Sequence, residues 1–110
     1  MNIKQGQALM DDIYNLMDAG KYEGANKLVA KLLPTAEKKG WQQLFNNALE
    51  MGLVIAIETN NLVGADKLAK KLAEQPPSAY GLFLQARLFM ANNQKREALE
   101  MGRRAFDFAE

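Results

Sequence analysis

The chain has 110 residues, of which 48% are hydrophobic and 25% charged, which is the balance of a folded domain and not of a disordered segment. Its 14 Lys and Arg residues stand against 13 Asp and Glu residues, so a net charge of +1 gives no field that would recruit nucleic acid or an anionic membrane. The lack of cysteine and histidine excludes disulfides, thiolate chemistry and imidazole catalysis, and we expect a cytoplasmic protein without a cofactor or a metal ion.

Apolar residues recur at helical spacing along the whole chain, and short polar turns separate the periodic stretches. In the first stretch Leu9, Ile13 and Leu16 share one helical face, and Gly20 follows as a C-terminal cap. The second stretch contains Pro34, which has no amide donor and disfavours helical geometry at the residue before it, so we expect a kink or a break there. The expected helices cover residues 5–19, 22–39, 41–58, 62–74, 79–91 and 95–108.

The third expected helix should be the central one. Its residues 53–57 are apolar on nearly every side, and Gly40 is expected to cap its beginning. Pro76 and Pro77 cannot continue the fourth helix, and Ser78 is a good N-cap for the fifth. The connections between the expected helices are short, which is typical of antiparallel helical neighbours.

An internal repeat underlies this order of elements. The segment at residues 24–32 is repeated at residues 64–72. Both segments begin with Gly-Ala, continue with Asn or Asp and then Lys-Leu, and end, after two further residues, with a second Lys-Leu. A looser third copy begins at Glu97. Each copy follows a short polar turn, and a further helical stretch precedes each turn. The unit is therefore helix, turn, helix, and we expect one domain over residues 1–110 with repeats at about 5–39, 41–77 and 78–110.

This pattern resembles the tetratricopeptide repeat family, whose small residue early in the second helix matches Ala25, Ala65 and Ala98. Ala65 and Ala98 are separated by nearly the family period, whereas Ala25 and Ala65 lie farther apart, so we place an insertion at residues 34–40. The chain departs from the family where leucine replaces the characteristic tryptophan of each repeat. The resemblance implies an all-α fold of three antiparallel helix pairs stacked as a right-handed superhelix. It also implies a protein-binding function.

The resemblance further implies a concave groove lined by the first helix of each pair. Methionine and aromatic side chains are frequent among the expected groove residues, and both suit an apolar partner such as an amphipathic helix. The alternative is that several of these side chains only pack between helices. The expected groove residues are Gln7, Met10, Tyr14, Met17, Asn47, Glu50, Val54, Ile57, Tyr80, Phe83, Arg87 and Met90.

Two well-known uses of the family give different expectations. Members that bind acidic chaperone tails clamp a carboxylate with basic and amide side chains, and here only Arg87 fits; it could instead pair with Glu50 or with an acid of the partner. The small size resembles the tetratricopeptide-like chaperones of bacterial type III secretion, which cover an aggregation-prone helix of a secreted subunit. The sequence therefore favours an adaptor or a small chaperone over a carboxylate clamp.

The sixth expected helix suggests a second possible function, a self-assembling scaffold. Its apolar residues could dock against a second copy, giving a homodimer, or against another domain of a larger protein. The alternative is that Phe106 folds back onto the fifth helix. The candidate contact residues are Leu99, Met101, Phe106 and Phe108.

Other function classes are disfavoured by the sequence. Four pairs of basic residues are interspersed with acids and lack accompanying aromatic residues, so we expect no nucleic-acid binding. Asp11 and Asp12 are adjacent on a helix and point about 100° apart, so they cannot share an acid-base site. No stretch reaches the roughly 18 apolar residues of a membrane span. We expect neither an enzyme nor an inserted membrane protein.

Overall fold

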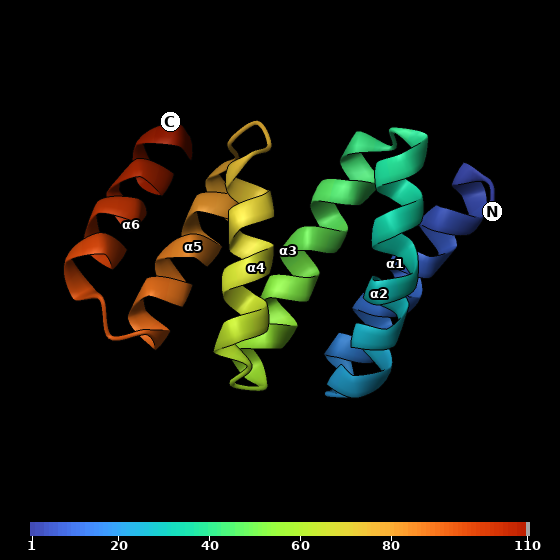
Figure 1. Ribbon diagram of the computed structural model, residues 1–110, viewed down its shortest axis with the longest axis horizontal. Coiled ribbons are helices and arrows are strands. Elements are labelled where there is room, and N and C mark those ends of the chain that lie inside the picture. The colour runs from blue at the N-terminus through green and yellow to red at the C-terminus, as the bar shows by residue number, and fades with distance from the viewer. Residues whose placement is uncertain (110) are drawn as a thin grey trace.

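Residues 1–109 are described by a computed structural model, in which these residues form six α-helices and no strand (Figure 1). The expected all-α class is thereby confirmed. The helices are α1 (Ile3–Asp18), α2 (Tyr22–Lys39), α3 (Gln42–Glu58), α4 (Leu62–Ala73), α5 (Ala79–Ala91) and α6 (Lys95–Ala109).

Local side-chain and backbone chemistry explains where the helices begin and end. A capping box begins α1, because the Asn2 side chain accepts a hydrogen bond from the Gln5 amide and the Gln5 side chain accepts one from the Asn2 amide. After α1, Gly20 takes the expected left-handed conformation, with φ at 74°. The Ser78 hydroxyl accepts a hydrogen bond from the amide of Gly81 at 3.0 Å, so the expected cap of α5 is confirmed.

The expected break at Pro34 is wrong, because α2 continues through it to Lys39. Pro34 is exposed to solvent, whereas Leu32 and Ala36 on either side of it are fully buried. Burial of these neighbours keeps this part of α2 helical against the rest of the molecule despite the lost backbone hydrogen bond. The residues assigned to an insertion lengthen α2 to 18 residues, against 12 in α4, and Gly40 ends α2 in the left-handed conformation and does not cap α3.

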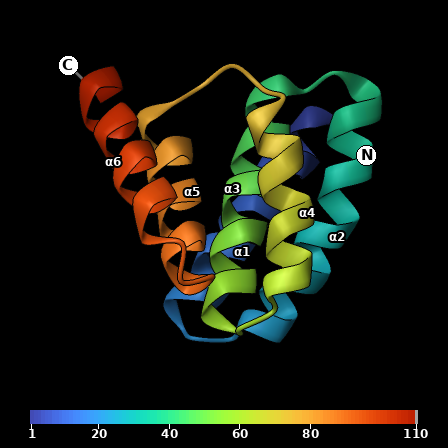
Figure 2. The same cartoon turned by 60° about the vertical axis from the view of Figure 1, so that its left-hand side comes forward.

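The helices are arranged as three antiparallel pairs in a row along the longest axis of the molecule (Figure 1). Within each pair the two helices contact one another, and α2 and α4 also contact the first helix of the following pair. The first helices form one layer, because α1 contacts α3 and α3 contacts α5. The α2 and α4 helices lie together on one side of it and form a second layer (Figure 2). Within residues 1–109, α6 contacts only α5.

The core is centred on α3, as the sequence predicts. Leu49 and Leu53 of this helix are fully buried, and α3 contacts α1, α2, α4 and α5. Small residues allow this close approach: Ala65 is fully buried, and a methyl group added at Gly52 would lie 3.2 Å from Leu68 and Val29. The α3 helix therefore holds the stack together. Its half-buried face, between α1 and α5, carries the expected groove residues of this helix.

A candidate binding groove on the face of α1, α3 and α5

The twelve expected groove residues fall on three helices that adjoin in the order α1, α3, α5. On each helix they are spaced by three, four and three residues, so each set follows one helical face. The four residues of α3 are all half-buried, whereas the sets on α1 and α5 include exposed side chains. The face therefore has a floor on α3 and more exposed walls on α1 and α5.

The walls carry large apolar side chains that are open to solvent. Tyr14 of α1 is exposed, and on α5 the exposed residues are Tyr80, Phe83 at 50% and Met90 at 57% of their full accessible area. The rings of Tyr80 and Phe83 stack with their centroids 6.5 Å apart. Surfaces of monomeric proteins rarely carry several large exposed apolar groups on one face, and such a set is typical of an interaction site.

A cleft of about 500 Å³ lies between α1 and the first half of α3. The structure brings four expected residues together in it: Gln7, Met10, Tyr14 and Asn47. Met10 is only 3% exposed, so it belongs to the core and forms the bottom of the cleft. This end of the candidate site therefore forms a cleft with a buried side chain at its base.

Trp41 also lines this cleft and was not predicted as a site residue. It is half-buried, and a methyl group added at Gly6 would lie 3.1 Å from the Trp41 ring and 3.1 Å from Leu44. Gly6 thus allows the ring to approach the backbone of α1. The only tryptophan of the chain, directly after a glycine between two helices, is the signal that could have identified it.

Glu50 occupies the middle of the floor and accepts a hydrogen bond from the Ser78 hydroxyl at 3.3 Å. Burial raises the pKa of Glu50 above its ordinary value, and the Ser78 hydrogen bond opposes this shift. Burial also raises the pKa values of Tyr14 and Tyr80, with the Glu50 carboxylate as the second cause in both cases. One carboxylate therefore influences an aromatic ring on each wall.

Arg87 pairs with Glu58, with its Nη2 atom 2.7 Å from Oε1, so the alternative of a pair with Glu50 is wrong. Glu58 is the last residue of α3, two turns beyond Glu50, and Arg87 lies in the second half of α5. An Arg87 already bound to a carboxylate of its own chain is a poor clamp for an acidic peptide.

Three other expected groove residues, Met17, Val54 and Ile57, are half-buried and pack against the core. For these residues the alternative of inter-helix packing describes most of their contacts. The exposed part of the candidate groove is thus concentrated on Gln7, Tyr14, Tyr80, Phe83 and Met90.

The four expected contact residues of α6 do not form one patch. Leu99 and Phe106 are seven residues apart on one side of the helix and are 73% and 67% exposed, so Phe106 does not fold back onto α5. Phe108 is exposed on the side of the helix that also carries the half-buried Met101. Self-association through this helix would therefore use either of two surfaces.

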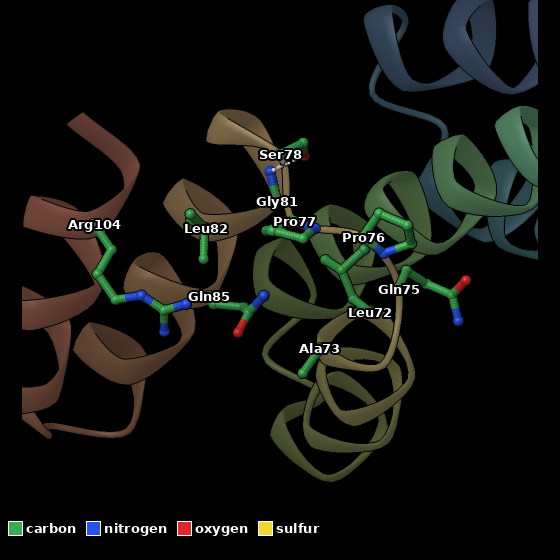
Figure 3. A pocket seen from close by; sticks show the side chains of 10 residues that line it. All are labelled: Leu72, Ala73, Gln75, Pro76, Pro77, Ser78, Gly81, Leu82, Gln85 and Arg104. Carbon is green, nitrogen blue, oxygen red and sulfur yellow. Dashed lines mark hydrogen bonds between the residues drawn. The ribbon is translucent and has the colours of Figure 1, made fainter. Parts of the chain in front are cut away.

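A smaller pocket of about 190 Å³ lies where the connection between α4 and α5 faces α6 (Figure 3). Pro76 and Pro77 stand on one side of it, and Arg104 extends from α6 towards α5 on the other. A shallow hollow beside it is lined by Pro77, Arg104 and Phe108. This region is formed by the end of α4, the connection, α5 and α6, and none of the twelve expected groove residues lines it.

Comparison with known proteins finds no matching family model, no matching curated protein and no matching solved structure. Within residues 1–109, no helix is long and apolar enough to cross a membrane. The same residues contain no group of three or more carboxylate, imidazole or thiol side chains placed to hold a metal ion.

Proposed function

We propose that this chain is a protein-binding module, an adaptor or a small chaperone, which holds a segment of a partner polypeptide on the face of α1, α3 and α5. We further propose that its three helix pairs form a right-handed superhelix of the tetratricopeptide type, with this face on the concave side. The observation that carries the proposal is the set of exposed apolar side chains, Tyr14, Tyr80, Phe83 and Met90, on both sides of a half-buried floor.

An amphipathic helix is the partner segment that these features favour. Its apolar stripe would lie along α3, between the aromatic side chains of the two walls. The cleft beside Tyr14 falls within the range of about 300–1,000 Å³ typical of ligand sites, so it can receive side chains that project from such a helix. Flexible Met90 at the other end would adapt to a partner of irregular shape.

The test is affinity capture with the wild-type protein and two matched variants, followed by calorimetry on any purified partner. Phe83→Glu places a charge on the proposed face, whereas Val63→Glu places the same charge at a 71% exposed apolar position on α4, in the other layer. We expect Phe83→Glu to abolish binding and Val63→Glu to retain it. Partners bound equally by both variants would move the function to another surface.

Self-assembly through α6 is the second candidate, because Leu99 and Phe106 present two large exposed apolar groups on one side of that helix. Under this proposal, Phe106→Glu should convert a dimer into a monomer in sedimentation velocity, while Phe83→Glu should leave the dimer intact. A wild-type protein that stays monomeric at millimolar concentration would exclude it.

A further inference from the structure

The centre of the proposed groove contains a negative charge that the chain itself does not neutralise. Within residues 1–109 the ion pairs join Lys27 to Glu23, Lys71 to Glu37 and Arg87 to Glu58, and Glu50 takes part in none of them. Glu50 is half-buried in the middle of α3. A carboxylate held partly out of water without a cation is unfavourable unless something else compensates it.

The N-terminus of α5 provides part of this compensation. The Ser78 hydroxyl accepts a hydrogen bond from the Gly81 amide and donates its own proton to Oε2 of Glu50. The same oxygen lies 3.7 Å from the point where a methyl group at Gly81 would stand, so the carboxylate rests against the first turn of α5. These contacts fix the carboxylate through one oxygen. The other oxygen, Oε1, has no hydrogen-bond donor among the side chains and backbone of the described residues.

Aromatic side chains are present on the α1 and α5 walls on either side of the α3 floor that carries this carboxylate. The pKa of each of Tyr14 and Tyr80 responds to the charge of Glu50, and the Phe83 ring stacks on Tyr80. A carboxylate beside aromatic rings attracts a cation in two ways, through a charge-assisted hydrogen bond and through the negative faces of the rings. It repels an anion. The chemistry of the centre is therefore selective for positive charge.

We propose that the partner segment carries an arginine or lysine side chain that binds Glu50 between Tyr14 and Tyr80. Apolar side chains of the same segment then flank the cation, on one side in the cleft next to Tyr14 and on the other against Phe83 and Met90. The occupant is thus a basic, amphipathic segment. This inference rests on the proposed function, because it specifies the partner of the same groove.

Selection of binders from a displayed library of random 16-residue peptides tests the proposal without a known partner. The baits are the wild-type protein, Glu50→Gln and Glu23→Gln. Glutamine keeps an acceptor for the Ser78 hydroxyl and removes only the charge, while Glu23→Gln removes the same charge from a 90% exposed side chain on α2. We expect wild type and Glu23→Gln to enrich peptides in which a Lys or Arg is flanked by apolar residues, and Glu50→Gln to lose the basic preference.

The possible outcomes separate this inference from the proposed function. Apolar peptides without basic enrichment, or equal basic enrichment with Glu50→Gln, would overturn the cation site and leave the groove standing if Phe83→Glu abolishes their binding. Peptides that bind equally to Phe83→Glu, or no peptides at all, would overturn both.

A selected peptide then permits a double-mutant cycle. Replacing its arginine by the neutral isostere citrulline should weaken binding to the wild type by about tenfold or more, the loss expected for a hydrogen bond to a charged group. The same replacement should change binding to Glu50→Gln by less than about twofold, because the partner charge is already gone. Independent losses from the two changes would show that the arginine binds elsewhere and would refute the proposal.

Discussion

Pro34 gives a direct measure of how strongly tertiary packing holds α2 together. This residue lies inside the helix, where it cannot donate a hydrogen bond to the carbonyl of Ala30 and where its ring crowds that carbonyl. Pro34 is exposed, so Pro34→Ala removes little packing. The substitution restores the missing donor in the middle of an 18-residue helix.

The expected effect is a stabilisation of about 2 kcal/mol. Proline costs about 3 kcal/mol relative to alanine in a helix interior. Alanine gives back up to about 1 kcal/mol of this gain, because it leaves the unfolded chain more conformational freedom than proline does. For a chain of this size the net gain corresponds to an increase of about 8 °C in the melting temperature.

Urea unfolding followed by circular dichroism measures the change, and Pro76→Ala is the matched control. Pro76 is exposed in the connection between α4 and α5, outside any helix, so its replacement should lower the free energy of unfolding by no more than about 1 kcal/mol. Opposite signs for the two variants support a helix that continues through Pro34. If Pro34→Ala leaves the stability unchanged or lowers it, α2 is not a continuous helix in solution, and the account of its packing is refuted.

Three further substitutions test the core, a cap and the groove carboxylate. Leu49→Ala removes a fully buried side chain of α3 and should lower the free energy of unfolding by about 2–5 kcal/mol in urea titrations, whereas a loss below 1 kcal/mol would contradict the central position of α3. Ser78→Ala should cost about 1 kcal/mol through the lost cap of α5, and Thr35→Ala, at a half-buried position of α2 whose hydroxyl makes only a long 3.5 Å contact, is its milder control. Burial raises the pKa of Glu50 above 4.5, so the folded state holds this proton more tightly than the unfolded chain and loses stability as the pH rises through the range above 4.5. The free energy of unfolding of Glu50→Gln, relative to that of the wild type, should therefore be higher at pH 7 than at pH 4 in urea titrations. The reverse order would show that the carboxylate is stabilised by its surroundings.

The helices could be predicted from the sequence because their signals are local. Helical periodicity, Ser78 before α5 and Gly20 after α1 act within one or two turns, and each marks a helix end to within about two residues of its observed place. Pro34 misled the prediction because its local cost is opposed by non-local burial. Leu32 and Ala36 are buried by contacts from other helices, and a single helical segment contains no information on that burial.

The candidate site could be predicted only in part. Helical spacing places the expected residues of each of α1, α3 and α5 on one face of that helix, because residues three and four apart share a face by helix geometry alone. It does not separate exposed Phe83 from buried Met10, which occupy equivalent positions on α5 and α1. Met10 belongs to the core cluster and Phe83 does not, although α5 contacts three helices and α1 only two, so the number of neighbouring helices does not explain the difference.

Glu50 shows why the charge of a site is harder to predict than its shape. From the sequence, Arg87 and Glu50 are reasonable partners, since both belong to expected groove positions on neighbouring first helices. In the structure Arg87 pairs with Glu58, and Ser78, the N-cap of α5, donates a hydrogen bond to Glu50. The pairing of Arg87 with Glu58 thus leaves the Glu50 carboxylate without a cation among the described residues, although every helix stays in its predicted place. The specificity of such a groove depends on side-chain pairing between helices, and it can change through one or two substitutions while the stack remains the same.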